Sequence, residues 1–397
     1  MLDSSTVTTR KLYYEDAYLK EFAAEVISAE GNDVVLNATA FFPEEGGQSA
    51  DRGVLAGREV LDVRIRDGCI HHYLGGPVSG GAAEAIVSGS SVVGVIDWDY
   101  RFSNMQQHSG EHLFSGLVHA KYGYDNVGFH LSDNEVTMDF SGSLSAEALR
   151  EIEDHANRAI SLNIATQIVF LSGEEAERAE YRSKIDLTDE VRVVIFPGYD
   201  ACACCAPHVG RSGEIGCLKV VGAVSYKGGT RVSMLCGKRA MDLFRHDRDM
   251  LVRTANFLTT NTDEVYESVS RLKDENGELK ARLKQAGLRI MEMKVAAFPE
   301  GDGNAIIFEG PEADQTVIRE AVNKLVVKRS GYCAVFAGDD ASGYRFIIGI
   351  RDGDARLASG LLKERFGAKG GGKPAMVQGS VQAAREDLLR LFDAYFV

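Results

Sequence analysis

Two pairs of residues with the same internal spacing are the part of this sequence best suited to chemistry. His108 and His112 form the first pair, and Cys204 and His208 form the second. Residues four apart lie above one another on a helix, so both side chains of the first pair can reach one ion. Imidazole nitrogen and thiolate sulfur are ligands that zinc prefers, and four of them close a tetrahedral site. The spacing therefore predicts one zinc ion bound by all four side chains.

The segments around the two pairs indicate how they are positioned. Residues 103–107 offer a capping residue and good helix formers, and the apolar residues that follow recur at helical spacing: Leu113, Phe114, Leu117 and Val118. Pro207 argues against a continuous helix through the second pair. We therefore expect the first pair on a helix and the second on a turn that follows an apolar strand at 191–196.

Each of these residues also has a simpler interpretation. A lone pair of histidines four apart arises by chance, and Cys204 alone can be a small buried hydrophobe. Glu111 follows His108 by three residues, so it is either a catalytic base or metal-site partner, or an ordinary solvated glutamate. Ser109 is either a further catalytic candidate or a residue that steadies the helix.

The run from His108 to His112 also fits the His-x-x-Glu-His pattern of the inverzincin metallopeptidases. Those enzymes take a downstream carboxylate as a third ligand. Glu214 or another glutamate would then have to replace Cys204 and His208. The well-spaced Cys/His pair disfavours this alternative.

A second stretch, residues 43–53, carries adjacent glycines. Gly46 and Gly47 allow close backbone approach to a ligand, and Gln48 adds a donor and an acceptor that can bind a hydroxyl or an ester carbonyl. The same residues also fit an ordinary polar hairpin turn. From the residues alone, both interpretations stay open.

Composition limits the class of protein. A chain of 397 residues with 45% hydrophobic and 26% charged residues is globular and long enough for two or three domains. Its seven cysteines are odd in number and bunched at 202, 204 and 205, which indicates a reducing, cytoplasmic compartment. We expect no membrane span and no signal peptide. A net charge of −14 argues against indiscriminate polyanion binding, although a local basic face remains compatible with it.

Hydrophobic patterning predicts an α+β protein with four parts. Residues 1–95 contain short strands separated by turns, including one at 33–42, which is typical of a small β-barrel. Residues 96–242 mix helices and strands around the zinc ligands, residues 243–298 form a coiled-coil helix, and residues 299–397 form a compact α/β domain.

The coiled-coil prediction depends on a heptad repeat. Apolar residues recur every seven positions at Leu258, Val265, Leu272, Leu279, Ala286 and Met293. Asn276 falls at an a position, where a buried asparagine sets register and strand number. This indicates a homodimer formed through the coiled coil and the C-terminal domain. The alternative is that the helix packs against another segment of its own chain.

Three runs together resemble a known family. Residues 43–53, 105–113 and 204–216 look like the three signatures of the alanyl-tRNA synthetase editing domain, in the same order. The chain has no room for an aminoacylation core, so it resembles the free-standing AlaX-type trans-editing proteins. That resemblance implies zinc, a barrel-like domain before an α+β domain, and hydrolysis of tRNA(Ala) mischarged with serine or glycine.

The resemblance can be carried over residue by residue. His108, His112, Cys204 and His208 match the metal ligands of the family, and the segment from Gly46 to Gln48 matches its glycine-rich motif. Two features depart from the pattern. Glu45 stands where many relatives have another glycine, and Cys205–Pro207 stand where the synthetase has Gly-Gly-Thr. These departures leave the amino-acid selectivity open.

The C-terminal part carries its own signal. We expect residues 369–379 to form a loop in which three glycines and flanking lysines contact phosphate, similar to the glycine-rich end of DHHA1 domains. The residues expected to contact tRNA are Lys363, Arg365, Lys369, Gly370, Gly371, Gly372 and Lys373. A second basic stretch lies at 211–240. The opposing interpretation is that basic and acidic residues are merely segregated along an acidic chain.

These observations favour a cytoplasmic, zinc-dependent aminoacyl-tRNA deacylase that binds the acceptor end of tRNA(Ala). In it Glu111, Gln48 and Ser109 are the catalytic candidates, and Gly46, Gly47 and Gln48 bind substrate. A non-enzymatic alternative is a zinc-stabilised tRNA-binding module, which would retain tRNA affinity without turnover. We expect Ser-tRNA(Ala) as the main substrate and Gly-tRNA(Ala) as a further one.

Overall fold

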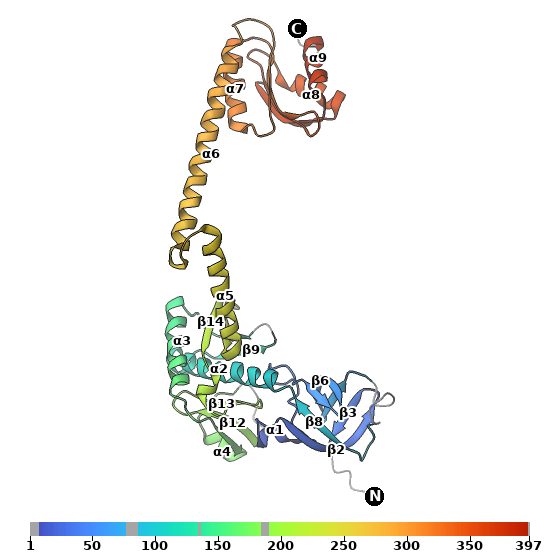
Figure 1. The fold of residues 1–397 in the computed structure, drawn as a ribbon, viewed down its shortest axis with the longest axis vertical. Coiled ribbons are helices and arrows are strands. Elements are labelled where there is room, and N and C mark those ends of the chain that lie inside the picture. The colour runs from blue at the N-terminus through green and yellow to red at the C-terminus, as the bar shows by residue number, and fades with distance from the viewer. Residues whose placement is uncertain (1–7, 77–85, 134–135, 184–189, 396–397) are drawn as a thin grey trace. The chain divides into compact units, whose positions relative to one another are not determined.

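The computed structural model describes residues 8–76, 86–133, 136–183 and 190–395. It divides into two compact units, residues 1–250 and 251–397, and the division falls within α5 (Gly237–Leu258) (Figure 1). The four-part division expected from the sequence stays a prediction at its finer boundaries. Each unit is described by itself.

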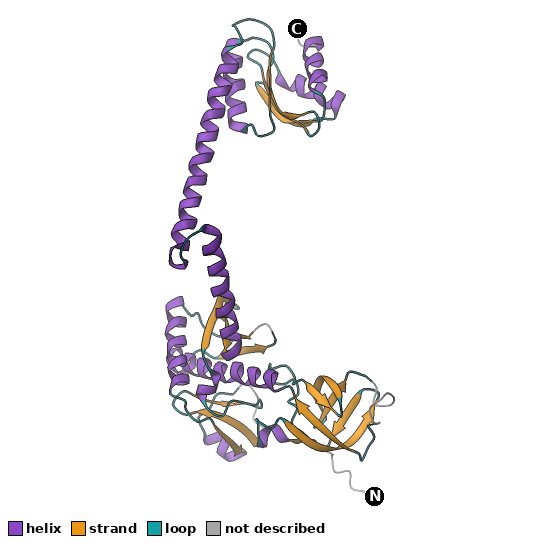
Figure 2. Cartoon of the chain, viewed as in Figure 1, coloured by secondary structure: helices purple, strands orange, loops and turns teal. Residues whose placement is uncertain are grey.

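The first unit begins with a closed barrel of six antiparallel strands, drawn as a group of arrows in Figure 2. The expected small β-barrel is confirmed. Its strands follow one another around the barrel as β2 (Glu21–Glu30), β3 (Asp33–Leu36), β7 (Cys69–Leu74), β6 (Arg58–Arg66), β5 (Gly53–Leu55) and β8 (Ser91–Ile96).

Alternation of side chains explains these strands. In β7 and β8, and in β2 as far as Val26, every second residue is buried, as a half-buried strand requires. The single strand predicted at 33–42 is wrong, because the chain leaves the barrel after β3 and forms β4 (Ala38–Thr39), which pairs in parallel with β1 (Arg10–Lys11). A short helix, α1 (Leu12–Glu15), follows β1. Phe41 and Phe42 then fill the barrel core.

A buried ion pair joins the barrel to the long helix α2 (Trp98–Tyr122). Arg101 and Asp51 are both fully buried, and Nε of Arg101 donates to Oδ1 and Oδ2 of Asp51 at 2.9 Å each. Nη1 of Arg101 also donates to the carbonyl of Ala17 at 3.1 Å. Asp51 belongs to the glycine-rich stretch 43–53, so this pair fixes that stretch on the helix.

Replacing Asp51 with alanine should lower the free energy of unfolding by about 3–5 kcal/mol, because it leaves the Arg101 charge buried without its partner. Asp133→Ala is the control, since it removes an exposed pair with Arg52 and should cost less than about 1 kcal/mol. Urea unfolding of both variants measures the difference. Equal, small losses would show that Arg101 and Asp51 do not hold the two parts together.

The rest of the first unit packs helices against two antiparallel sheets. One sheet has the order β14 (Leu218–Tyr226), β15 (Gly229–Cys236), β10 (Val136–Phe140) and β9 (Asn126–Leu131). The other has the order β11 (Gln167–Ser172), β12 (Glu190–Phe196) and β13 (Asp200–Ala203). The helical elements are α2, α3 (Ala146–Ser161), α4 (Gly173–Arg178) and the 3₁₀ turn η1 (Ser212–Ile215).

Helix α2 runs through the core of this region. Asp97 caps its N-terminus by accepting from the amide of Tyr100 at 3.1 Å, and Gly123 ends it in the left-handed conformation. Gly116 allows a close approach, because a Cβ there would lie 2.5 Å from the carbonyl oxygen of Tyr199. A glycine that is unfavourable for helix propensity therefore lets β13 pack directly on α2.

The second unit is built around one mixed sheet with the order β16 (Ala305–Glu309), β17 (Cys333–Asp339), β18 (Gly343–Gly349), β20 (Met376–Val381) and β19 (Lys369–Lys373). Its helical elements are η2 (Thr262–Glu264), α6 (Val265–Ala296), α7 (Gln315–Lys328), α8 (Ala355–Phe366) and α9 (Arg385–Tyr395). In β17, Val335 faces the core formed with α6 and α7, and Phe336 faces the core formed with α8 and α9. The sheet is thus covered on both faces (Figure 1).

Two expectations for this region are corrected. The expected continuous helix at 243–298 is broken between α5 and α6, where Thr259 has a positive φ of 54°. The expected loop at 369–379 is instead the hairpin of β19 and β20, because the glycines pair backbone to backbone. All five residues of β19 are exposed.

Among the described residues, every helix is too short or too polar to span a bilayer. The α6 stripe that suggested a coiled coil includes Leu279 and Leu283, which are 62% and 72% exposed. Coiled-coil pairing therefore stays a prediction.

Candidate metal centre

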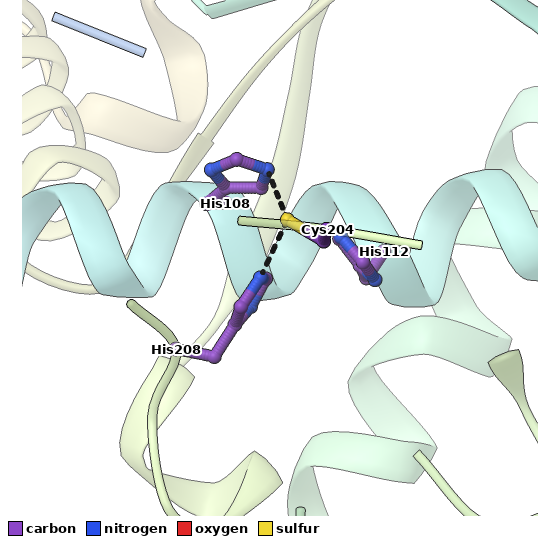
Figure 3. Close-up of side chains that lie close together, drawn as sticks. All are labelled: His108, His112, Cys204 and His208. Atoms are coloured by element: carbon purple, nitrogen blue, oxygen red, sulfur yellow. Dashed lines mark hydrogen bonds between the residues drawn. The ribbon is translucent and has the colours of Figure 1, made fainter. Parts of the chain in front are cut away.

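Four side chains from two distant segments meet inside the first unit (Figure 3). His108 and His112 project from α2, and Cys204 and His208 come from the turn that follows β13. Each offers one ligand atom, and these atoms all lie within 4.8 Å of one another. The structure therefore brings together the full set of ligands that the spacing predicted.

The distances fit a zinc ion. Sγ of Cys204 lies 3.3 Å from Nε2 of His208 and 3.6 Å from Nε2 of His108, as the dashed lines in Figure 3 mark. With ordinary zinc–sulfur and zinc–nitrogen lengths, the edge of a tetrahedral site between sulfur and nitrogen is about 3.6 Å. Cys204, His108 and His208 are thus separated by the spacing that one zinc ion requires, and His112 offers a nitrogen within 4.8 Å of the other ligand atoms.

Each histidine is oriented by a different group at its other ring nitrogen. Nδ1 of His108 lies 2.7 Å from Oε1 of Gln48, so the amide oxygen accepts from the ring. Nδ1 of His208 lies 3.0 Å from Oγ of Ser109, which also accepts from the amide of Val209 at 3.2 Å. These contacts leave Nε2 of both rings free to face Cys204, as partners beyond the ligands do in metal sites.

The third histidine is oriented by a carboxylate. Nδ1 of His112 lies 3.0 Å from Oδ2 of Asp200, close enough for an ion pair although the ring N–H is poorly aligned for a hydrogen bond. Asp200 is held in turn by Arg182, whose Nε and Nη2 donate to its two oxygens at 2.7 and 2.9 Å. Arg182, Asp200 and His112 therefore form one chain of contacts that ends at the cluster.

Asp200 and Arg182 were missed by the sequence analysis. Asp200 lies four residues before Cys204, and an acidic residue beside a ligand turn was a usable signal. Arg182 carried no signal, because it reaches Asp200 only through the packing of its segment beside β13. His112, Asp200 and Cys202 also lie close enough to form a second metal-like group, but the Arg182 guanidinium occupies both oxygens of Asp200.

Protonation in the cluster follows from burial and charge. Burial opposes ionisation of Cys204, but His108 and His208 hold the pKa of its thiol well below the usual value. Burial opposes charge on His112 as well, yet Asp200 and Cys204 raise its pKa well above the usual value. Burial lowers the pKa of His208 to about 3. These shifts favour a negative thiolate on Cys204 and a positive charge on His112, which offset each other. A bound metal cation would offset the thiolate charge in place of the proton on His112, and that proton would be released.

Replacing Asp200 with alanine should weaken zinc binding by about 10- to 100-fold, because His112 loses the partner that orients its ring. Asp139→Ala is the matched control, since Asp139 pairs with Arg231 on the other sheet. Competition with a coloured chelator measures both affinities. An Asp200→Ala variant that binds zinc as tightly as the control would remove Asp200 from the metal site.

Glu111 is buried and lies beside the cluster. It is 3% exposed, which excludes the interpretation as a solvated glutamate. Its Oε1 accepts from Oγ of Ser115 and from Nδ2 of Asn126 at 2.6 Å each. Its Oε2 lies 3.9 Å from Nε2 of His112, so the carboxylate faces the metal ligands.

The glycine-rich turn lies on the opposite side of His108. Gly47 has a φ of 82°, and a Cβ there would lie 2.3 Å from the carbonyl oxygen of Phe129. The amide of Leu131 donates to the carbonyl of Gly47 at 2.7 Å. Only glycine satisfies both conditions, so the turn lies flat on β9 and carries the buried side chain of Gln48 to His108.

A polar pocket of about 510 Å³ opens beside this turn. Residues from the turn, β6 and β9 line it, among them Glu45, Gly46, Gly47, Gln48, Arg66 and His130. Gln48 thus lines the pocket and also contacts a metal ligand. A volume of this size suits a small organic group.

The remaining expected residues lie elsewhere. Lys363 and Arg365 are at the end of α8, and Lys369 to Lys373 form the exposed edge strand β19, all in the second unit. In the stretch 211–240, Lys219 and Arg231 are paired with Glu153 and Asp139. Glu214, which the peptidase alternative needs, accepts from the hydroxyl of Tyr18 at 2.6 Å and is not among the clustered ligands.

Parts of the sequence are similar to those of known tRNA synthetases. Residues 191–235, which include Cys204 and His208, match the family described as the threonyl and alanyl tRNA synthetase second additional domain. This segment is therefore similar to a domain found in those tRNA synthetases. Over most of its length the chain is a homologue of the alanyl-tRNA synthetases, which agrees with the resemblance to their editing domain and to the AlaX-type proteins.

Three relatives show the extent of the similarity. The alanine–tRNA ligase of Ignicoccus hospitalis is 31% identical over 78% of this chain and 35% of its own length. Those of Pyrococcus abyssi and Archaeoglobus fulgidus are 30% and 31% identical over 94% and 98% of this chain, and 42% and 44% of their own lengths. The chain thus spans less than half the length of these relatives.

One solved structure matches about a quarter of the chain. The C-Ala domain of Aquifex aeolicus alanyl-tRNA synthetase is 16% identical to this chain and covers 24% of it, with a TM-score of 0.20. That value is too low to support an argument about fold. The similarity of the C-terminal domain to DHHA1 domains therefore stays a prediction.

Proposed function

We propose that this chain is a zinc-dependent deacylase that hydrolyses mischarged aminoacyl-tRNA(Ala), with serine first and glycine second among the esters removed. The observation that carries the proposal is the four-ligand cluster, whose ligand His108 is contacted by the same Gln48 that lines a substrate-sized pocket. Homology to the alanyl-tRNA synthetases supports tRNA(Ala) as the nucleic acid.

Because four side chains would fill a tetrahedral shell, a bound zinc ion would have to accept a fifth ligand in order to polarise the ester carbonyl or lower the pKa of a bound water to about 7. His108, His112, Cys204 and His208 would hold that ion. Nε2 of Gln48 is a donor that is buried and has no hydrogen-bond partner among the described residues. Oε1 of Gln48 is already engaged by His108. We infer that this amide N–H binds an oxygen of the ester.

Glu111 is the candidate for moving a proton. Its Oε1 is occupied by Ser115 and Asn126, and its Oε2 is turned toward His112. A carboxylate at this place can accept a proton from the attacking water and return it to the leaving ribose hydroxyl. Ser109 is fully buried behind His208, so we assign it a positioning role instead of a catalytic one.

The second unit is proposed to contact the body of the tRNA. Lys369 and Lys373 lie at the ends of the exposed strand β19, and its three glycines leave the backbone open to a phosphate. We also propose that the chain forms a homodimer through α6 and acts in the cytoplasm. Its substrate would be tRNA(Ala) that a separate synthetase has mischarged, as for the AlaX-type proteins.

The test is the rate at which the purified chain releases amino acid from Ser-tRNA(Ala), Gly-tRNA(Ala) and Ala-tRNA(Ala). Fast release of serine or glycine with little release of alanine is expected. Tight binding of tRNA(Ala) without release from any ester would instead favour the zinc-stabilised binding module.

A further inference from the structure

Two residues that depart from the family pattern lie side by side. A Cβ at Gly46 would be 3.4 Å from Sγ of Cys205, so the Cys205 thiol lies against the turn that begins with Glu45. The two departures therefore form one feature of this site.

The backbone ties Glu45 to the metal ligands. Its amide donates to the carbonyl of Gln48 at 3.2 Å, and the amide of Gln48 donates back to the carbonyl of Glu45 at 3.1 Å. Gln48 contacts His108, and Cys205 directly follows Cys204. Glu45 is thus fixed to the cluster through both of the segments that it touches.

The carboxylate of Glu45 lacks a strong partner. Its Oε2 is buried and has no hydrogen-bond partner among the described residues, and the nearby thiol of Cys205 is only a weak donor. Within the described chain no ion pair joins it to a lysine or arginine, and Arg64 of the same pocket pairs with Asp62 and Glu44 instead. A buried carboxylate in this condition gains most from a charged donor.

We propose that Glu45 binds the α-ammonium group of the aminoacyl ester, and so makes a free amino group a requirement of this site. The inference rests on the deacylase function proposed above. In an aminoacyl ester the ammonium is separated from the carbonyl by one carbon atom. A group that binds the ammonium must therefore lie beside the groups that act on the carbonyl, as Glu45 does beside Gln48 and Cys204–Cys205.

The experiment compares Ser-tRNA(Ala) with N-acetyl-Ser-tRNA(Ala), in which the positive charge is removed. Glu45→Gln should slow hydrolysis of the free-amine ester by about 10- to 100-fold, the range of a hydrogen bond to a charged group. It should leave the rate for the N-acetyl ester unchanged, so the preference for the free amine collapses. Any steric effect of the acetyl group is the same in the wild-type protein and in the variant. It therefore cancels when the two proteins are compared by the ratio of their rates for the two esters.

Two further variants sharpen the test. Glu44→Gln removes the same charge from the neighbouring residue, which is exposed and paired with Arg64, and should keep the preference. Glu45→Gly removes the whole side chain and should lose the preference even if the glutamine variant folds poorly. Zinc content and circular dichroism are measured for each.

The outcomes separate the two proposals. A Glu45→Gln variant that keeps the full preference, or a wild-type chain that hydrolyses both esters equally fast, would overturn the role of Glu45 and leave the deacylase function standing. No hydrolysis of any ester by the wild-type chain would overturn the deacylase function, and this inference with it.

Discussion

Cys204→Ala should lose stoichiometric zinc and slow the hydrolysis of Ser-tRNA(Ala) by at least ~10³-fold. The thiol is the centre of the cluster, since Nε2 of two histidines lies 3.3 and 3.6 Å from it. Removing it leaves three imidazoles and takes away the negative charge that favours a cation. The loss of several kcal/mol of transition-state stabilisation corresponds to the expected factor.

His119→Ala is the control for this variant. His119 is on the same helix, seven residues after His112, but it is exposed and paired with Asp125. It should keep both zinc and activity. If Cys204→Ala retained zinc and turned over at the wild-type rate, the four residues would not be the metal site.

Gly47→Ala should lower the free energy of unfolding by about 2–5 kcal/mol and should also reduce activity. The new Cβ would lie 2.3 Å from the carbonyl oxygen of Phe129, and alanine is strained at a φ of 82°. The turn must therefore lift away from β9. Gln48 would then lose its 2.7 Å contact with His108.

Gly31→Ala is the control that separates the effect of backbone strain from that of the steric clash with Phe129. Gly31 also has a positive φ, of 63°, but a Cβ there would meet nothing within 4 Å. It should cost only about 1 kcal/mol and leave activity intact. Urea unfolding and the hydrolysis rate are compared for both variants, and equal effects would mean that the approach of the turn to β9 is unimportant.

The two pairs of side chains in the cluster could be predicted because the spacing within each pair is local. His108 and His112 meet through helical periodicity, and Pro207 places the second pair on a turn. The barrel was predictable for the same reason, since alternation in β7 and β8 is a property of each strand alone, although β2 was missed. Such features need no knowledge of the tertiary structure.

Other features depend on packing that a single sequence does not reveal. Arg182 reaches Asp200 only because its segment lies beside β13, and Asn126 reaches Glu111 from another strand. Lys369–Lys373 have the composition of a loop, yet pairing with β20 makes them a strand. Here tertiary contacts override local propensity.

The most direct test measures hydrolysis of Ser-tRNA(Ala) by the full chain in three states: as purified, after removal of metal by a chelator, and after zinc is restored. We expect hydrolysis by the purified chain, loss of hydrolysis after the metal is removed, and recovery of hydrolysis once one zinc per chain is restored. Hydrolysis that continues unchanged in the metal-free, folded protein would contradict the claim that the cluster of His108, His112, Cys204 and His208 is the catalytic centre.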